Sequence, residues 1–244
     1  MMRPPVLAAR IERRLLVNYR VDPDRAQHMI PERFRPVIVA GHAVAGVCLI
    51  RLGDVRLPGL PRFVGLRSEN AAHRIAVEWD DDGGTHTGVY IPRRDSGALA
   101  NVFLGGRVFP GVHHYAHFDV HETATDLDIA FRAHDGAVAV DASVAVSNDL
   151  AGSELFPSLA DASAFFEHGC VGVSATRDGD RVDAVELCTS AWKVEPVTVK
   201  SMHSSLFDDP ARFPAGTATL DCALLMRNVA VAWRAIPSVA LSGG

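Results

Sequence analysis

The sequence predicts a mainly β (α+β) fold, in which a single antiparallel β-barrel carries a few short helices. Short apolar or alternating segments, separated by Gly, Pro and Asp turns, occupy most of the 244 residues. The regular succession of strand and helix that is typical of a parallel sheet is absent. No linker-like segment divides the chain, so residues 1–244 are expected to form one domain with flexible ends at 1–12 and 237–244.

The N-terminal half begins with a strand and a capped helix. Residues 15–21 alternate apolar and polar side chains, which indicates a strand. Asp22 and Pro23 then provide an N-cap and a first-turn proline for a helix that ends before Pro31. Val- and Ile-rich segments between Gly, Pro and Asp turns predict further strands at 37–52 (a hairpin broken at 41–42), at 64–79 and up to about residue 91.

The C-terminal half begins with a short helix, expected at 96–104, that leads into a glycine-rich loop. A second helix is expected at 158–168 because Pro157 and Ser158 precede it. Alternating segments predict strands at 113–122, 126–133, 137–146, on both sides of 178–180, at 191–202 and as a pair within 217–234, with a short helical piece near 204–207.

Composition excludes several classes of protein. The chain is 48% hydrophobic and 22% charged, as soluble globular proteins are. Its net charge of −5 is unsuited to nucleic acid, which requires a basic face. No uncharged apolar run reaches the length of about 20 residues that spans a membrane, and the first residues lack the apolar core of a signal peptide. A cytoplasmic location is therefore expected.

The rarer side chains limit the available chemistry. The four cysteines are scattered without a CxxC pair, which indicates free thiols instead of disulfides or a zinc site: Cys48, Cys170, Cys188 and Cys222. Almost all cationic residues are arginines. Lysine occurs only at Lys193 and Lys200, so amine catalysis has two candidates.

Residues 105–115, with the sequence Gly-Gly-Arg-Val-Phe-Pro-Gly-Val-His-His-Tyr, form the most distinctive segment. It resembles the active-site loop of acetoacetate decarboxylase, in which a Gly-Arg pair precedes a Pro-Lys-Lys run. Arg107 and the glycine before it match the Gly-Arg pair, and His113 falls on the proline. His114 then falls on the lysine that forms the Schiff base in that family, and Tyr115 falls on the second lysine.

Other segments extend this resemblance over nearly the whole chain, in order: 17–24 with 30–32, 67–70, 186–197 and 203–207. The resemblance implies a cone-like β-barrel with an internal cavity for a small molecule, assembled as a homo-oligomer. Glu69 matches the family's catalytic glutamate, and Arg13 lies near the position of an active-site arginine. A second acidic residue of the family should fall near Cys48, where this chain has none.

These residues suggest acid–base chemistry in a dry cavity. An imidazole such as that of His114 acts as acid or base near neutral pH, while Glu69 would serve as its partner acid. Arg107 would hold a substrate carboxylate, and Tyr115 would donate to a carbonyl oxygen. The structural alternatives are a surface His114, a packed Tyr115, and a Glu69 that forms an ion pair with a nearby arginine.

Three further residues are expected to bind substrate, namely Arg13, His113 and Tyr90. Tyr90, Arg93 and Arg94 precede the short helix that leads to the glycine loop, where they would contribute to the mouth of the cavity. The alternative for Tyr90, Arg93 and Arg94 is the exposed end of a strand. On a regular strand His113 and Tyr115 would share a polar face and His114 an apolar one. Histidines four residues apart on a strand are separated by about 13 Å, too far to share one ion, so no metal site is expected.

The predicted function is that of an enzyme that acts on a small carbonyl or carboxylate compound without an imine. Enolisation, dehydration, cyclisation or decarboxylation would each suit the candidate residues, and no cofactor is expected. Two alternatives are a non-catalytic barrel that binds a small molecule and a barrel filled by its own side chains. The expected partners are a small-molecule substrate and other copies of the chain, with no nucleic acid and no membrane.

Overall fold

The computed structural model describes residues 6–81, 83–99, 102, 111–150, 152–179 and 181–240. Within them thirteen strands form one sheet. Three long strands make up its centre: β1 (Val6–Val21), β4 (His42–Arg56) and β5 (Leu66–Asp81). They are flanked by β13 (Ala218–Ala240), which pairs with β1, and by β6 (Gly84–Ser96), which pairs with β5.

The sheet divides at β6 and β13, because the outer edge of each strand pairs with two different strands. One branch consists of β10 (Val171–Ala175) and β11 (Arg181–Cys188), which connect β6 to β13. The other branch makes the same connection through four strands: β7 (His113–Glu122), β8 (Asp126–Ala133), β9 (Ala139–Val146) and β12 (Glu195–Ser204). The sheet therefore closes into two hydrogen-bonded rings that share five strands.

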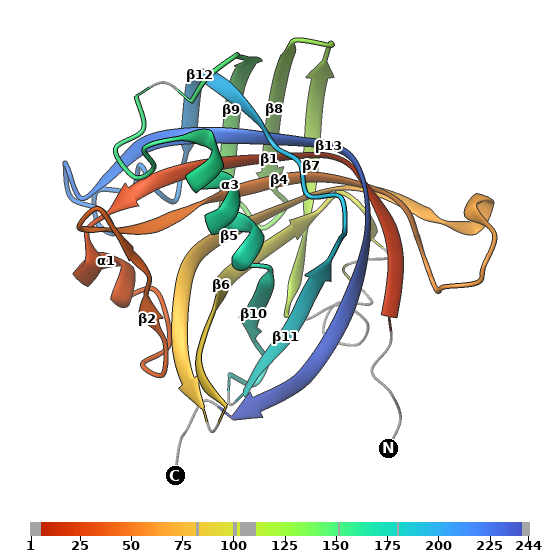
Figure 1. Cartoon of the computed structure of the whole chain (residues 1–244), viewed down its shortest axis with the longest axis horizontal. Helices are drawn as coiled ribbons and strands as arrows, with labels where there is room; N and C mark the ends of the chain where they lie inside the picture. The colour runs from red at the N-terminus through yellow and green to blue at the C-terminus, as the bar shows by residue number, and fades with distance from the viewer. Residues whose placement is uncertain are drawn as a thin grey trace.

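We call the ring through β10 and β11 the small ring, and the ring through β7, β8, β9 and β12 the large ring. In Figure 1 the two branches extend to opposite sides of the shared strands. The remaining elements are short: α1 (Pro23–Gln27), β2 (Arg35–Pro36), β3 (Ile38–Val39), the 3-10 turn η1 (Arg62–Val64) and α3 (Leu159–His168). The mainly β fold expected from the sequence is confirmed, although β6 pairs in parallel with both β7 and β10.

The shared strands bury both faces, because one core lies inside the large ring and others lie on the opposite face. On β1, Leu15 and Val17 belong to the large-ring core, whereas Leu16 packs in a second core beneath α3. On β4, Val47 and Cys48 divide between these cores in the same way. Strands buried on both faces are apolar throughout, so alternation along them does not reveal which face meets which core.

Several elements extend beyond their expected limits. Residues 6–12, expected to be a flexible end, begin β1 and pair with β13. The expected strand pair within 217–234 is one continuous strand, β13, that continues to Ala240. The capped helix is present as α1, where the Asp22 carboxylate accepts bonds from the backbone of the next turn. The helix expected at 96–104 lies mostly outside the described residues. No helix of the described segments has the length and apolarity to cross a bilayer.

His73 on β5 is an unusual member of the large-ring core. His73 is 1% exposed, and neither ring nitrogen has a hydrogen-bond partner among the described residues. The ring lies among aromatic neighbours, 6.4 Å from Phe131 and 6.2 Å from Phe207 between centroids. Burial lowers the pKa of His73 to about 4, and the positive charges of Arg93 and Arg212 act in the same direction.

We expect a His73→Leu variant to resist acid better than the wild type. The folded-state pKa of His73 lies below the unfolded value of about 6.5. Neutral His73 therefore makes its full contribution to the free energy of unfolding above pH 6.5, and this contribution is lost as the pH falls toward 4. That loss amounts to about 3 kcal/mol. Urea unfolding at a series of pH values gives the free energy of unfolding as a function of pH. Between about pH 6.5 and 4 this free energy should fall less for His73→Leu than for the wild type, while the exposed control His28→Leu should follow the wild type. An equal fall in His73→Leu would contradict the lowered pKa of His73.

Candidate functional site

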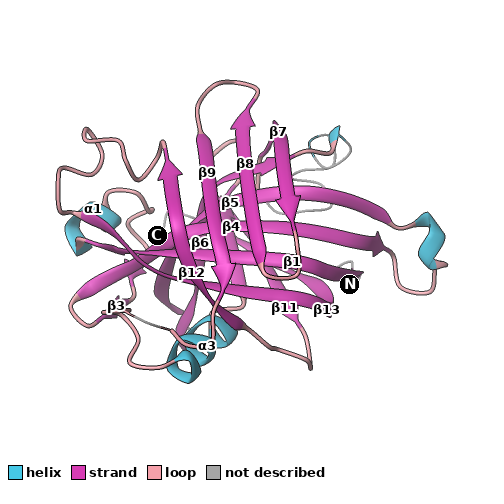
Figure 2. Cartoon of the chain, turned by 90° about the horizontal axis from the view of Figure 1, so that it is seen from above, coloured by secondary structure: helices cyan, strands magenta, loops and turns pink. Residues whose placement is uncertain are grey.

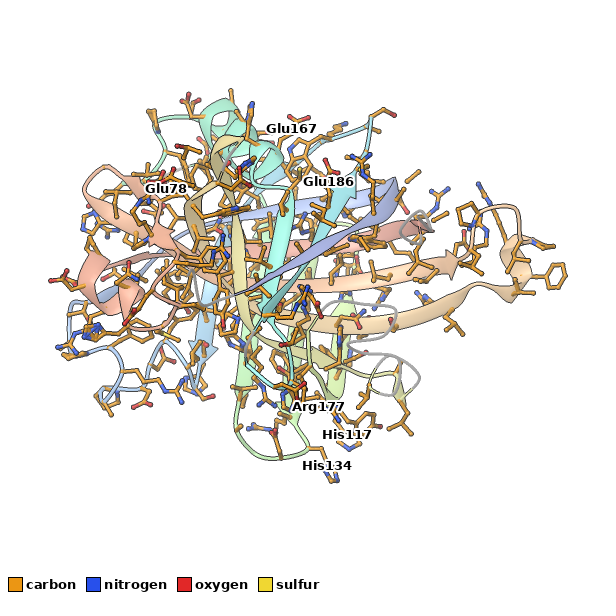
Figure 3. The ribbon with its side chains drawn as sticks, turned by 90° about the horizontal axis from the view of Figure 1, so that it is seen from below. Glu78, His117, His134, Glu167, Arg177 and Glu186 are labelled. Atoms are coloured by element: carbon orange, nitrogen blue, oxygen red, sulfur yellow. The ribbon has the colours of Figure 1, made fainter. Side chains whose placement is uncertain are left out.

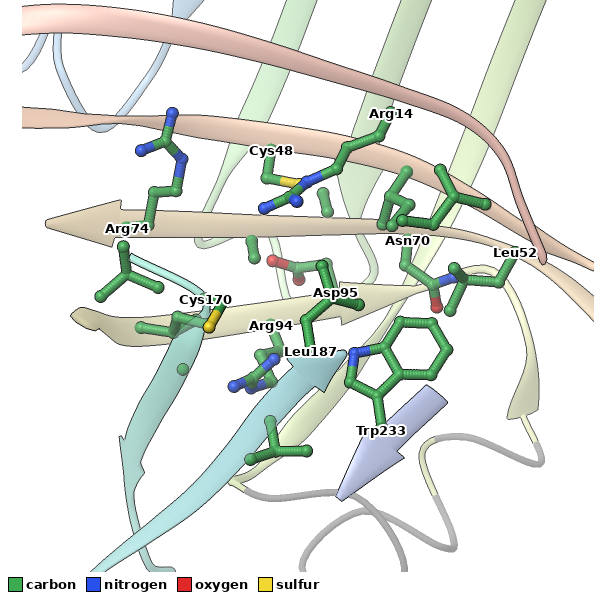
Figure 4. Close-up of a pocket in the computed structure, with 18 of the residues that line it drawn as sticks. Arg14, Cys48, Leu52, Asn70, Arg74, Arg94, Asp95, Cys170, Leu187 and Trp233 are labelled. Atoms are coloured by element: carbon green, nitrogen blue, oxygen red, sulfur yellow. The ribbon is translucent and has the colours of Figure 1, made fainter. Parts of the chain in front are cut away.

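The small ring encloses a cavity of about 150 Å³ (Figure 4). Residues from every strand of this ring contribute to its wall. Trp233 and Leu187 lie toward one end of the cavity, together with Leu52. These three belong to a local apolar cluster that also contains Ile11 and Met226. One end of the cavity is therefore apolar.

Three arginines also line the cavity: Arg14 on β1, Arg74 on β5 and Arg94 on β6. Nε of Arg14 donates to Sγ of Cys48 at 3.3 Å. Nε of Arg94 donates to Oγ of Ser174 at 3.2 Å, while its Nη2 is buried and has no hydrogen-bond partner in the described structure. Burial lowers the pKa of Arg94 to about 10, which still leaves its guanidinium charged at neutral pH.

Arg74 is buried more deeply than the other two, with 3% of its surface exposed. Its Nη2 donates to Oδ1 of Asn18, and its Cζ lies 4.7 Å from the centre of the Phe166 ring on α3. Nε and Nη1 lack partners within the described residues, and burial lowers the pKa of Arg74 to about 10. Arg74 thus packs α3 against the small ring of strands. It also adds a second incompletely paired cation to the cavity wall.

Negative charge in the wall does not balance these arginines. Among the described lining residues Asp95 is the one acid, and burial raises its pKa. Its carboxylate accepts bonds from Nε and Nη2 of Arg93, at 3.0 and 2.8 Å, and Arg93 also contacts Asp135 at 2.9 Å. Because Asp95 is already paired outside the arginine set, the cavity keeps an excess of positive charge that suits an anion.

His113 adds an uncharged imidazole to this wall. Its Nδ1 lies 3.3 Å from the carbonyl oxygen of Gly111, whose positive φ of 76° favours glycine. Burial lowers the pKa of His113 to about 4, and the nearby charge of Arg94 acts in the same direction. At neutral pH the ring is therefore neutral, and it can both donate and accept a hydrogen bond.

A protein-family model described as DUF2071, "Uncharacterized conserved protein", matches residues 8–227. The chain belongs to the DUF2071 family. No curated protein matches this DUF2071 chain.

Solved structures share its fold at low sequence identity. The enduracididine biosynthesis enzyme MppR, complexed with pyruvate, has a TM-score of 0.61 at 15% identity, over 99% of this chain and 92% of that one. Acetoacetate decarboxylase from Legionella pneumophila has a TM-score of 0.59 at 12% identity, over 96% and 88%. An acetoacetate decarboxylase-like enzyme from Sphingomonas wittichii has 0.57 at 10%, over 97% and 92%. These structures confirm the acetoacetate decarboxylase-like fold expected for the DUF2071 chain.

The predicted site residues do not gather at this cavity. Among the described residues that the sequence singled out for the site, His113 and Arg94 line it. His114 lies on the other face of β7, where its side chain is 36% exposed and its Nδ1 is 3.2 Å from Oδ2 of Asp135. Tyr90 is buried in the large-ring core beside Phe34. Arg107 lies outside the described residues, so its predicted role as an anion clamp stays a prediction.

Arg13 and Glu69 instead form a partly buried ion network with Arg51 and Glu122. Arg13 is 1% exposed and contacts Glu69 at 2.5 Å and Glu122 at 3.3 Å. Arg51 contacts Glu122 at 3.1 Å and also binds Glu69. Two cations and two anions balance within this network, which favours the ion-pair alternative for Glu69.

Tyr115 borders a separate surface groove together with Glu69 and His117. Its ring centroid is 5.2 Å from that of His117 and 6.2 Å from that of His134. Figure 3 shows His117 and His134 at the outer edge of the molecule, and neither they nor Tyr115 line the small-ring cavity. Tyr115 is therefore not placed to donate to a ligand in that cavity.

Neither lysine of the DUF2071 chain reaches the cavity. Lys193 is exposed, and Lys200 is exposed on β12 with its Nζ 2.5 Å from Oδ1 of Asp126. Arg14, Arg74 and Asn70 line the wall but were not singled out in the sequence. The signal that could have identified Arg14 and Asn70 is strand alternation, because each immediately follows a predicted site residue. Across the described residues, no three His, Cys, Asp or Glu side chains are arranged to hold a metal ion.

Proposed function

We propose that this DUF2071 protein is an enzyme that binds a small carboxylate bearing a carbonyl group in the small-ring cavity. It would act by acid–base chemistry, without an imine and without a cofactor. The observation that carries the proposal is the buried Arg94 guanidinium. Its Nη2 has no partner among the described residues, in a cavity where Asp95 is already neutralised by Arg93. A buried cation of this kind is costly unless an anion joins it.

The cavity chemistry suits proton transfer next to a carbonyl. Arg94 and Arg14 would bind the carboxylate, and the neutral His113 ring would contact the carbonyl oxygen or the adjacent C–H. His113 would accept that proton, the C–H electron pair would form a C=C bond, and the carbonyl π pair would move onto the oxygen. The arginines would stabilise the resulting enolate. A bound anion would also offset the charge of Arg94 that lowers the pKa of His113, so His113 would become a stronger base in the complex.

Two further observations support this assignment. Both lysines lie outside the cavity, so no side-chain amine is available there to form an imine. MppR, which shares the fold, has been solved with pyruvate and with the condensation product of pyruvate and imidazole 4-carboxaldehyde. A fold that binds a small 2-oxo acid in one protein can accommodate a related compound in another.

The apolar end of the cavity selects the rest of the substrate. Trp233, Leu187 and Leu52 would surround an apolar substituent on the side away from the arginines. The proposed substrate class is therefore 2- or 3-oxo acids that carry an aliphatic or aromatic group.

We expect Trp233→Leu to lower the affinity for phenylpyruvate by about 10-fold, because an aromatic contact worth roughly 1 to 2 kcal/mol is lost. Pyruvate, which has no such group, should bind Trp233→Leu as well as it binds the wild type. Isothermal titration calorimetry would measure both affinities. Trp79→Leu is the matched control, since Trp79 stacks on His86 away from the cavity and should leave both affinities unchanged. Equal losses for both ligands would argue against the apolar subsite.

Proton NMR in D2O tests the proposed reaction. The wild type should exchange the protons next to the carbonyl of pyruvate, phenylpyruvate or 4-methyl-2-oxopentanoate for deuterium, and Arg94→Met should not. Binding without exchange would reject the enzyme and favour the non-catalytic binding barrel. Absence of binding to all three would reject the site. A borohydride-stable adduct on Lys193 or Lys200 would reject the non-imine mechanism.

A further inference from the structure

We call residues 57–66 the arm; they comprise the connection from β4 to β5 and Leu66, the first residue of β5. In Figures 1 and 2 it projects away from the two rings and ends in the short turn η1. It contains five of the seven large hydrophobic side chains that are exposed in the described structure: Leu57 (52% exposed), Leu60 (48%), Phe63 (87%), Val64 (46%) and Leu66 (49%). A concentration of this kind on a monomeric surface is unusual and marks an interaction site.

The backbone of the arm holds these side chains outward. The amide of Leu60 donates to the carbonyl of Leu57 at 3.2 Å, and the amide of Val64 donates to that of Pro61 at 3.3 Å. Nε of Arg56 donates to the carbonyl of Leu60 at 2.9 Å, which ties the arm to the end of β4. A segment ordered in this way loses less conformational entropy on binding than a flexible loop.

The charge of the arm is opposite to that of the rest of the chain. Arg62 is the one charged residue within residues 57–66, so the arm has a net charge of +1. Because the whole chain carries −5, the remainder carries −6. A basic, apolar arm on an acidic body is complementary to another copy of that body. An anionic membrane would attract the arm but repel the far larger negative charge behind it.

We infer that the arm docks on a second copy of this chain. Exchange of arms across a two-fold axis would bury ten large apolar side chains, five from each arm, and would place each basic arm on an acidic body. In such an isologous interface each partner buries its own arm and also the surface that receives the other arm. The area buried per partner is therefore larger than that of one arm, and it approaches the roughly 800 Å² of a stable interface. Since β4 and β5 also supply Leu52 and Asn70 to the cavity wall, docking would steady one end of the small ring.

Light scattering after size-exclusion chromatography, over a wide dilution series, tests this inference. The wild type should elute with at least twice the 26.2 kDa mass of one chain. A Leu60→Asp/Phe63→Asp variant should have the mass of one chain. Both side chains are exposed, so the variant should keep the wild-type circular dichroism spectrum. Ile38→Asp is the matched control, because Ile38 is also exposed (48%) but lies outside the arm, and it should remain oligomeric.

Three results would overturn the inference: a wild type with the mass of one chain at every concentration, an oligomer that survives the double substitution, or dissociation by Ile38→Asp to the same extent. A sedimentation assay with phosphatidylserine vesicles provides a further check. Vesicle binding by the wild type that the arm variant loses would assign the arm to a lipid surface instead. None of these measurements depends on carboxylate binding, so the arm and the proposed function succeed or fail separately.

Discussion

Replacing Arg94 by methionine is expected to weaken binding of a small oxo acid about 100-fold or more, which corresponds to about 3 kcal/mol. Methionine fills much of the same space with an unbranched apolar chain but has no charge, so the wall stays filled while the anion loses its buried partner. Isothermal titration calorimetry with pyruvate and phenylpyruvate would measure the change. Arg67→Met is the control, because Arg67 is exposed and pairs with Glu12 outside the cavity.

The same substitution should stabilise the empty protein. In the described part of the chain Nη2 of Arg94 is buried without a partner, and burial lowers the pKa of this arginine. Its charge therefore lowers the free energy of unfolding of the ligand-free protein. Arg94→Met should therefore unfold at a higher temperature than the ligand-free wild type. Loss of binding together with a gain of stability cannot result from misfolding. Unchanged affinity, or a destabilised variant, would show that Arg94 has a purely structural role.

Most strands were predictable because alternation and turn residues are local signals. The longest strands were not, because tertiary contacts determine their ends. The segment from Arg10 to Arg14 has too many charges to resemble a buried strand, yet Arg13 is 1% exposed and bonded to Glu69 and Glu122. These partners come from distant strands, and no local pattern reveals them. β13 likewise lacks a turn because it pairs with β1 along most of its length.

At the site, three predicted residues lie next to a side chain that lines the cavity. Arg13 and Glu69 are the neighbours of Arg14 and Asn70, and His114, the leading candidate, is the neighbour of His113, which was itself predicted to bind substrate. Successive side chains on a strand point to opposite faces, so an offset of one residue transfers a side chain to the other face. On β1 and β5 each face is buried in a different core. The polarity of the side chains therefore does not show which face meets the cavity.

On β7 the expected alternation is present, but the cavity lies on the other side. His114 shares a face with Ala116, which is buried in the large-ring core, as the apolar pattern indicated. The cavity belongs to the small ring and meets the opposite face, to which His113 belongs. The sequence suggested one barrel with one interior. It did not indicate that the sheet closes twice, so it assigned the apolar face to the cavity.

The ion network of Arg13, Arg51, Glu69 and Glu122 gives the second large expected effect. A Glu69→Ala variant should lose about 3 kcal/mol of unfolding free energy, because two arginines lose a carboxylate and one of them is almost fully buried. Urea unfolding would measure this loss. The Arg13→Met/Glu69→Met double variant should recover much of it, since removing both charges avoids an unpaired buried cation.

Arg67→Met, which breaks the exposed contact with Glu12, should cost no more than about 1 kcal/mol. Where enough Glu69→Ala remains folded, its affinity for oxo acids should equal that of the wild type, because Glu69 does not line the small-ring cavity. The opposite pattern would indicate that Glu69 has a catalytic role, as the resemblance to acetoacetate decarboxylase implies. In that case Glu69→Ala would fold with wild-type stability and lose proton exchange, and the ion network, not Arg94, would mark the reacting centre.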